Sequence, residues 1–218
     1  MRTPTICCLL LLASNYLYSS ERIEVLAVDY PPFTTSKVSG NGVSFRLLKK
    51  HLGAIEGLVI EPVFLPPTRL QQRIKAGEWC FSFYPVSDDR SDVRFLALAD
   101  RKFKIGLYHQ EDDPLINWTH LAQLKGYRVA LLRTDRSTSF FNRFTSAGMI
   151  PVFVDNVEQG LRMLQRKRVD VALGDEYLTD FVFAEANDFK AFGFAATPLF
   201  ETSIGLYINN ACSQAKLF

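Results

Sequence analysis

The chain has 218 residues, a net charge of +2, and 48% hydrophobic and 22% charged residues. This length suits one large domain or two small ones, and the composition excludes a disordered or fibrous chain. The small net charge, with no basic stretch of interleaved aromatic residues, argues against nucleic acid as a partner.

Residues 1–20 have the layout of a secretory signal peptide. Arg2 supplies a positive charge, residues 6–13 form a short apolar run, and small and polar residues follow up to Ser19 and Ser20. The run is too short to span a membrane as a helix, which needs about 20 apolar residues. A buried first strand or helix is the other interpretation of this segment. We expect cleavage near Ser19 or Ser20 and a soluble, periplasmic or secreted mature protein.

Two of the four cysteines, Cys7 and Cys8, lie in this predicted signal segment, so Cys80 and Cys212 remain in the mature chain. An oxidising compartment permits a disulfide between them. The sequence does not decide whether their geometry allows one. Neither the cysteines nor the three histidines have the spacing of a metal site, so we expect no metal and no cofactor.

Strand and helix signals alternate in the first part of the mature chain. Apolar runs predict strands over residues 22–28, 58–65 and 81–86. Between them, Phe45, Leu48 and Leu52 share one helix face, and the prolines at 66–67 open a second helix that ends near Gly77.

The alternation continues to the end of the chain. Further strands are predicted over residues 103–108, 128–132, 150–154, 169–173 and 202–208, and helices over 119–124, 137–147, 157–164 and 176–186. Asn156 with Gln159 forms a pair that resembles a capping box at one helix start. This alternation predicts an α/β fold of parallel βαβ units. Ligands of such folds bind at the carboxyl ends of the strands, so the candidate binding segments are residues 29–33, 84–90, 133–137 and 174–176.

Four motifs carry a resemblance to a known family. They are V-D-Y-P-P-F at residues 28–33, S-D-D-R-S-D-V-R-F at 87–95, L-K-G-Y-R-V-A-L-L at 124–132 and R-V-D-V-A-L-G-D at 168–175. In order and spacing they resemble the family 3 extracellular solute-binding proteins, the periplasmic components of polar amino-acid ABC transporters. The similarity runs from about Ile23 to Ile208, nearly the whole mature chain.

The resemblance implies a two-lobed periplasmic-binding-protein-like fold of type II. Each lobe would be a mainly parallel sheet flanked by helices, and two hinge strands would join the lobes. Lobe 1 is expected over residues 21–107, with a return over 199–218, and lobe 2 over residues 108–198. The ligand would lie between the lobes, which close around it by a hinge motion. The family continues through a further helix packed on lobe 1, which we expect to be truncated here.

The resemblance also implies the ligand contacts. The arginine that binds the ligand carboxylate falls on Arg90, the aspartate that binds the ammonium falls on Asp175, and Tyr30 matches an aromatic residue that stacks on the ligand. A planar guanidinium binds a carboxylate with two parallel hydrogen bonds, which fits this assignment. The other expected ligand-binding residues are Asp29, Phe33, Tyr84, Thr134, Arg136 and Ser137. The main-chain amides at the helix start near Ser137 are expected to add to carboxylate binding.

Considered without the family, the same residues have simpler interpretations. Arg90 lies among several aspartates and fits a surface ion pair. Asp175 fits a helix N-cap, and Tyr30 and Phe33 fit core packing. The arginines of segment 133–137 point to a polar or acidic ligand.

The leading prediction is a monomeric binding protein, not an enzyme, that captures a small amino-acid-like ligand or similar carboxylate for an inner-membrane ABC permease. One alternative is a divergent, sensor-like protein that binds no amino acid. It is favoured by the bulky residues 83–85 and the short C-terminus. The other is a periplasmic dehydratase on the same scaffold, for which Glu176 and Asp29 are the placed acid–base candidates.

Overall fold

The computed structural model describes residues 21–53, 55, 57–86, 90–113, 118–182 and 192–218. The strands are β1 (Glu21–Ala27), β2 (Leu58–Phe64), β3 (Phe81–Ser82), β4 (Val93–Gln110), β5 (Arg128–Leu132), β6 (Ile150–Val154), β7 (Val171–Asp175), β8 (Phe192–Phe194) and β9 (Phe200–Asn209). The α-helices are α1 (Val43–Leu52), α2 (Pro67–Lys75), α3 (Ser139–Ser146), α4 (Val157–Gln165) and α5 (Leu178–Val182). Short 3-10 helices are η1 (Ser39–Asn41), η2 (Leu121–Leu124) and η3 (Ser213–Leu217). The predicted signal segment, residues 1–20, lies outside the described residues.

The described strands form one curled, mixed sheet. Its order is β2-β1-β3-β9-β4-β7-β5-β6, and β8 pairs with β4. The strand β1 is parallel to β2 and β3, and β5 is parallel to β6 and β7. The long strands β4 and β9 are antiparallel to each other and to their other neighbours. The predicted α/β class is confirmed. The two sets of parallel strands, β1–β3 and β5–β7, belong to one continuous sheet.

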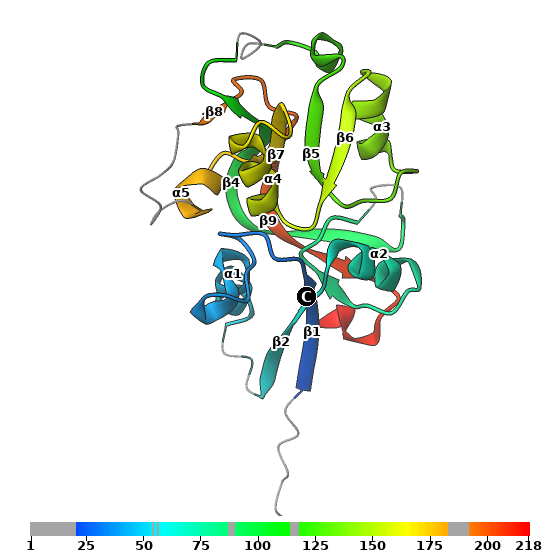
Figure 1. Ribbon diagram of the computed structural model, residues 1–218. Helices are drawn as coiled ribbons and strands as arrows, with labels where there is room; N and C mark the ends of the chain where they lie inside the picture. Colours follow the sequence, from blue (N-terminus) through cyan, green and yellow to red (C-terminus); the bar gives the residue numbers. More distant parts are fainter. Residues whose placement is uncertain (1–20, 54, 56, 87–89, 114–117, 183–191) are drawn as a thin grey trace, which may run out of the picture.

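The long strands β4 and β9 cross the middle of the molecule and connect its two parts (Figure 1). We call β1–β3 with α1 and α2 the first half, and β5–β7 with α3–α5 the second half. Strand β4 pairs with β9 from Val93 to Ala97 and from Lys102 to Ile105, with a register shift between Ala97 and Lys102. The sequence predicted only the last part of β4, because its charged segment around that shift lacks an apolar pattern.

Each half has a helix layer on both faces of its strands. Because successive strand residues point to opposite faces, Val25 of β1 packs in a cluster with Phe45 of α1. Its neighbour Leu26 packs in a cluster with Leu70 of α2. Strand β5 repeats this pattern between α3 and α4. In both halves the carboxyl ends of the parallel strands point toward the middle of the molecule (Figure 1).

Most predicted elements are confirmed, and the differences have local causes. Strands β5 and β6 match residue for residue, and Asn156 caps α4 by accepting a hydrogen bond from the Gln159 amide. The helix predicted over 119–124 is the 3-10 turn η2, and β7 begins and ends two residues later than predicted. Strand β3 stops early because the Tyr84 amide donates to the Ser82 hydroxyl, 3.0 Å away, instead of to a strand. Strand β8 was not predicted, and the end of the helix predicted over 176–186 lies outside the described residues.

A disulfide between Cys80 and Cys212 answers the question that the sequence left open. Their Cα atoms lie 5.4 Å apart, within the usual range for a disulfide. The bond joins the segment before β3 to the start of η3, with which the chain ends. It therefore holds the C-terminal segment against the first half.

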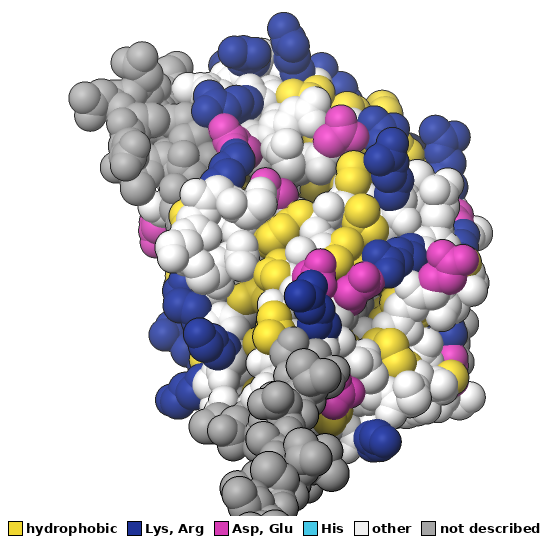
Figure 2. Space-filling model, turned by 90° about the horizontal axis from the view of Figure 1, so that it is seen from below, with side chains coloured by type: hydrophobic (Ala, Val, Ile, Leu, Met, Phe, Trp, Pro, Cys, Tyr) yellow, Lys and Arg dark blue, Asp and Glu magenta, His cyan; other side chains and the backbone are white. Residues whose placement is uncertain are grey.

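The surface carries mixed charges. Figure 2 shows acidic and basic side chains interspersed on one face, beside a band of hydrophobic side chains. This distribution agrees with the net charge of +2. Among the described residues, no helix is long and apolar enough to cross a membrane.

Candidate ligand-binding site

The loop after β1 brings aromatic side chains to the middle of the molecule. Tyr30 and Thr34 close a tight turn, in which each main-chain amide donates to the carbonyl of the other, at 2.6 and 3.0 Å. Within the turn, the ring of Phe33 stacks on Phe103 of β4, with ring centroids 4.6 Å apart. The loop is thereby fixed against the strand that connects the two halves.

The same loop also caps helix α1. The carbonyls of Pro32 and Phe33 accept hydrogen bonds from the first amides of α1, at Val43 and Ser44. Gly42 precedes the helix with a φ of 97°, and a Cβ on it would lie 2.9 Å from the Pro32 carbonyl oxygen. A glycine is therefore needed here for both conformation and space.

Asp175 ends β7 and is fully buried, at 0% exposure. One carboxylate oxygen, Oδ1, accepts a 2.9 Å hydrogen bond from the Tyr177 amide. The other oxygen, Oδ2, has no hydrogen-bond partner in the described part of the chain. Burial raises the pKa of this carboxyl from 3.8 to about 6. An unpaired buried carboxylate oxygen is costly, and a cation is the partner that satisfies it best.

Tyr30 faces Asp175 from the opposite half of the molecule. Its ring packs against the apolar cluster of the second half that contains Tyr108 and Leu178. Burial raises the pKa of the Tyr30 hydroxyl well above its usual value, and the negative charge of Asp175 raises it further. The structure thus brings together two of the predicted ligand-binding residues, one from each half.

Arg90 is bound by other groups of the chain. Its guanidinium forms a bidentate ion pair with Asp92, and its Nη1 donates to the Ile74 carbonyl at the end of α2. The Arg90 side chain is about one third exposed. In this structure Arg90 therefore has the ion-pair arrangement that the residues alone suggested.

The loop after β5 contains an anion of its own where a ligand carboxylate was expected. Asp135 Oδ1 accepts hydrogen bonds from both the amide and the hydroxyl of Ser137, each at 2.9 Å. The other oxygen of Asp135 pairs with Lys75 of α2, across the two halves. This Lys75 contact is the largest cause that lowers the pKa of Asp135. Helix α3 is capped by Thr138 and begins at Ser139, two residues after the predicted start.

Tyr84 and Thr134 meet through a glutamine that sequence reasoning missed. Gln71 of α2 donates from Nε2 to the Tyr84 hydroxyl at 2.6 Å and to the Thr134 hydroxyl at 3.3 Å. Gln71 and Lys75 are four residues apart, so they share one face of α2. The helix spacing could have grouped them, but it could not show which surface they face.

The arginines of the same loop point elsewhere. Arg133 and Arg136 both lie over the ring of Phe153 in β6, with 6.0 and 5.7 Å from the guanidinium carbon to the ring centroid. Arg133 also pairs with Asp155 at 3.2 Å. These contacts hold both arginines against the second half.

The residues proposed for acid–base chemistry have different surroundings. Glu176 Oε1 accepts a 3.0 Å hydrogen bond from the Lys104 amide, so this side chain binds the main chain of β4. Asp29 Oδ1 is buried without a partner among the described residues. In the described ranges no three His, Cys, Asp or Glu side chains form a group that could hold a metal ion.

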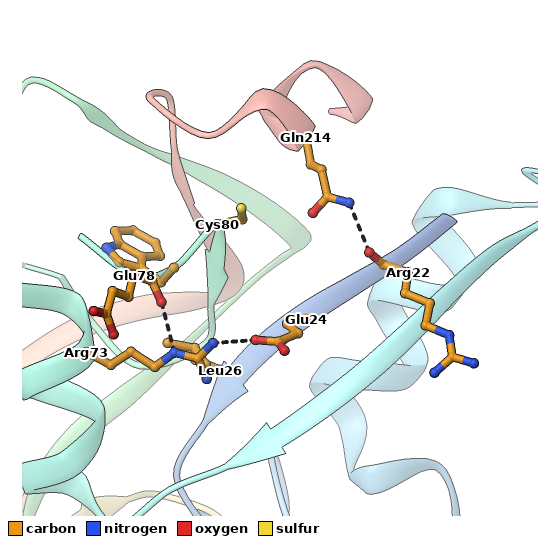
Figure 3. A pocket seen from close by; sticks show the side chains of 8 residues that line it. Arg22, Glu24, Leu26, Arg73, Glu78, Cys80 and Gln214 are labelled. Atoms are coloured by element: carbon orange, nitrogen blue, oxygen red, sulfur yellow. Dashed lines mark hydrogen bonds and ion pairs between the residues drawn. The ribbon is translucent and has the colours of Figure 1, made fainter. Parts of the chain in front are cut away.

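A shallow pocket of about 250 Å³ lies in the first half, away from the Tyr30–Asp175 pair. Arg73 crosses it, pairing with Glu24 and donating to the Glu78 carbonyl at 2.9 Å, while Gln214 donates to the Arg22 carbonyl at 2.9 Å (Figure 3). Arg73 and Glu24 thus satisfy each other. The indole Nε1 of Trp79, which also lines the pocket, is buried without a hydrogen-bond partner among the described residues.

Comparison with solved structures shows the fold. The model resembles the GluR0 ligand-binding core of Nostoc punctiforme in complex with L-glutamate (TM-score 0.68, 20% identity, 89% of this chain and 88% of that chain). It also resembles arginine-bound truncated ArgBP of T. maritima (TM-score 0.69, 18% identity, 92% of each chain). A third match is the VFT2 domain of Bordetella pertussis BvgS (TM-score 0.64, 18% identity, 90% of this chain and 84% of that chain). No protein-family model and no curated relative matches the sequence.

These matches define the class of structure. The chain has the periplasmic-binding-protein-like fold that the resemblance to family 3 solute-binding proteins implied. The matched structures include proteins with a bound amino acid and a domain of BvgS. At these identities the likeness concerns the fold.

Proposed function

We propose that the mature chain is an extracytoplasmic binding protein that captures a small, amino-acid-like ligand between its two halves. The observation that carries this proposal is the buried Asp175, whose Oδ2 has no partner among the described residues. An ammonium group would satisfy that oxygen. The Cys80–Cys212 disulfide supports an oxidising compartment, and residues 1–20 would then be the signal peptide that directs export.

The two halves would act as the two lobes. In this proposal, residues 21–107 with 199–218 form one lobe and residues 108–198 the other, and β4 and β9 form the hinge. The register shift in β4 supports a bend in this strand. Contacts between Lys75 and Asp135, and between Gln71 and Thr134, join the halves directly. Ligand entry would require these contacts to separate.

The binding residues would have distinct roles. Asp175 would bind the ammonium, and the rings of Tyr30 and Phe33 would pack on the ligand body. Because Tyr30 faces Asp175 in this structure, its hydroxyl would move aside when a ligand amine binds. Arg90 would bind a ligand carboxylate only after release from Asp92. A binding protein of this class would deliver its ligand to an ABC permease.

A sensor-like domain is the second candidate. Two observations favour it: direct contacts join the halves, and the fold resembles a BvgS domain. In a sensor the joined form would be the resting state, and a ligand would shift the population between two forms.

A thermal-shift screen of residues 21–218 against the twenty amino acids tests the proposal. A ligand that binds only the folded state raises the midpoint, by about 5–10 °C at a concentration of about 100 Kd. Asp175→Asn should abolish the shift, whereas the exposed Asp180→Asn should not. A folded protein with no shift for any compound would favour the sensor-like candidate.

A further inference from the structure

Three donor groups that a ligand carboxylate could use are already paired with carboxylates of the chain itself. The guanidinium of Arg90 is paired with Asp92. The amide and hydroxyl of Ser137 are bound by Asp135, which also takes the ammonium of Lys75. A ligand carboxylate would therefore have to displace an internal carboxylate from its partners.

The unsatisfied groups near the middle of the molecule have the opposite character. Asp29 Oδ1, after β1, and Asp175 Oδ2, after β7, are both buried and make no well-formed hydrogen bond in the described part of the chain, although the Tyr30 hydroxyl faces the Asp175 carboxyl closely enough to lower its pKa. Both are hydrogen-bond acceptors, and they come from opposite halves. Asp175 is completely buried, which makes a missing partner costly. A protonated amine supplies three donors and a positive charge, which is what such an oxygen lacks.

We propose that this site recognises the ammonium group of a primary amine and does not require an α-carboxylate on the ligand. The inference rests on the proposed function, because it assumes that a ligand binds beside Asp175. It narrows the ligand to amines with an aliphatic or aromatic body, including amines that result from decarboxylation of amino acids.

The aromatic side chains beside the carboxylates fit such a ligand. Tyr30 and Phe33 come from the loop that also carries Asp29, and Phe33 is stacked on Phe103. Aromatic rings attract cations by their faces and pack on apolar chains. A molecule with an amine at one end and an apolar body would satisfy both parts of this surface.

Matched pairs of ligands test the inference directly. Isothermal titration calorimetry of residues 21–218 would compare lysine with cadaverine, ornithine with putrescine, tyrosine with tyramine, and phenylalanine with phenethylamine. Each pair differs only by the α-carboxylate, so the ratio of its two Kd values measures how much the protein uses that group. We expect at least one amine to bind at least as tightly as its parent amino acid.

Variants assign the effect to the named groups. Asp175→Asn should weaken the best amine by at least about tenfold, and Asp29→Asn should weaken it as well, while Asp180→Asn should leave it unchanged. Asp135→Ala releases Ser137 and Lys75 for a ligand carboxylate. It should therefore lower the Kd of an amino acid relative to the Kd of its amine. Asp155→Ala, which removes an aspartate near the same loop, is the matched control. Melting curves of each variant establish that it is folded.

The outcomes separate the inference from the function on which it rests. If every amino acid that binds does so more tightly than its amine, the inference is wrong and the proposed function stands. If no compound of either set binds the folded protein, the inference is wrong, and the thermal-shift screen against the twenty amino acids decides on the proposed function. Amine binding that Asp175→Asn leaves unchanged would also overturn the inference, because the amine would then bind elsewhere.

Discussion

Tyr30, from the loop after β1, faces the buried carboxylate of Asp175 at the end of β7. The two residues belong to opposite halves of the sheet, as do Tyr84 and Thr134, which both accept hydrogen bonds from Gln71. The Tyr30 ring packs on the core of the second half, and the Asp175 charge raises the pKa of its hydroxyl. This pair is therefore the point at which a ligand would connect the two halves.

The first prediction concerns the pH dependence of stability. The pKa of Asp175 is raised by burial from 3.8 to about 6, so its protonated form is favoured in the folded state. The preference of the folded state for the protonated Asp175 carboxyl adds to the free energy of unfolding below about pH 4. This contribution is lost as the pH rises through about 6. Asp175→Asn removes this loss and should raise the free energy of unfolding at pH 7.5 by up to about 3 kcal/mol.

Urea unfolding of both proteins at pH 4 and pH 7.5 provides the measurement. The advantage of Asp175→Asn over the wild type should be small at pH 4 and larger at pH 7.5. Comparing the two proteins cancels the other titrating groups, including Asp135 and Asp170, whose lowered pKa values act in the opposite direction. An advantage that is equal at both pH values would contradict the prediction.

The second prediction concerns the disulfide. Cys80 and Cys212 enclose a sequence separation of 132 residues, and a bond across so long a loop restricts the unfolded chain strongly. Cys212→Ser should lower the free energy of unfolding by about 3–5 kcal/mol. Denaturant unfolding with and without a reducing agent measures it. Reductant should destabilise the wild type and leave Cys212→Ser unchanged; a wild type insensitive to reduction would refute the prediction.

The third prediction concerns the loop that carries Tyr30. Gly42→Ala places a Cβ against the carbonyl groups of Pro32 and Phe33, at a φ of 97°. We expect a loss of more than about 2 kcal/mol of stability together with loss of ligand binding, because the loop must shift. Gly53→Ala is the control: its φ is 59°, and a Cβ would meet nothing within 4 Å.

The Gly53→Ala control should lower the free energy of unfolding by about 1–2 kcal/mol, from backbone strain alone, and should leave ligand binding intact. Chemical unfolding and calorimetric titration measure both effects. Equal losses in the two variants would show that the contact with the loop carbonyls is unimportant.

The fourth prediction concerns the contacts that join the halves. Lys75→Gln removes the ion pair with Asp135, and a Gln71→Ala change in the same chain removes the bridge to Thr134. The double variant should have a larger radius of gyration in small-angle X-ray scattering, because these contacts connect the halves beside the hinge strands. Arg133→Gln breaks a pair within the second half and should not change the radius. No difference between the double variant and the wild type would indicate that other contacts hold the halves together.

The sequence by itself determined the α/β class, most strands and helices, and the segments after strands as candidate binding segments. This was possible because the apolar period, prolines, glycines and caps act locally. The alternation of strands and helices thus predicted both βαβ sets, and the loop motifs located Tyr30 and Asp175. The sequence did not predict the full length of β4 because its middle is charged and exposed. The strand is continuous only in the fold, where β9 pairs with it on both sides of this segment.

The tertiary structure alone decided which polar groups meet. The sequence placed Arg90 and Ser137 as receptors for a ligand carboxylate, yet the fold pairs them with Asp92 and Asp135. It also brought Lys75 of α2 to Asp135 in the other half and left Asp175 buried beside Tyr30. Such pairings depend on distances across the sheet, which local sequence patterns do not encode. For the same reason burial, and with it the raised pKa of Asp175, follows only from the packed molecule.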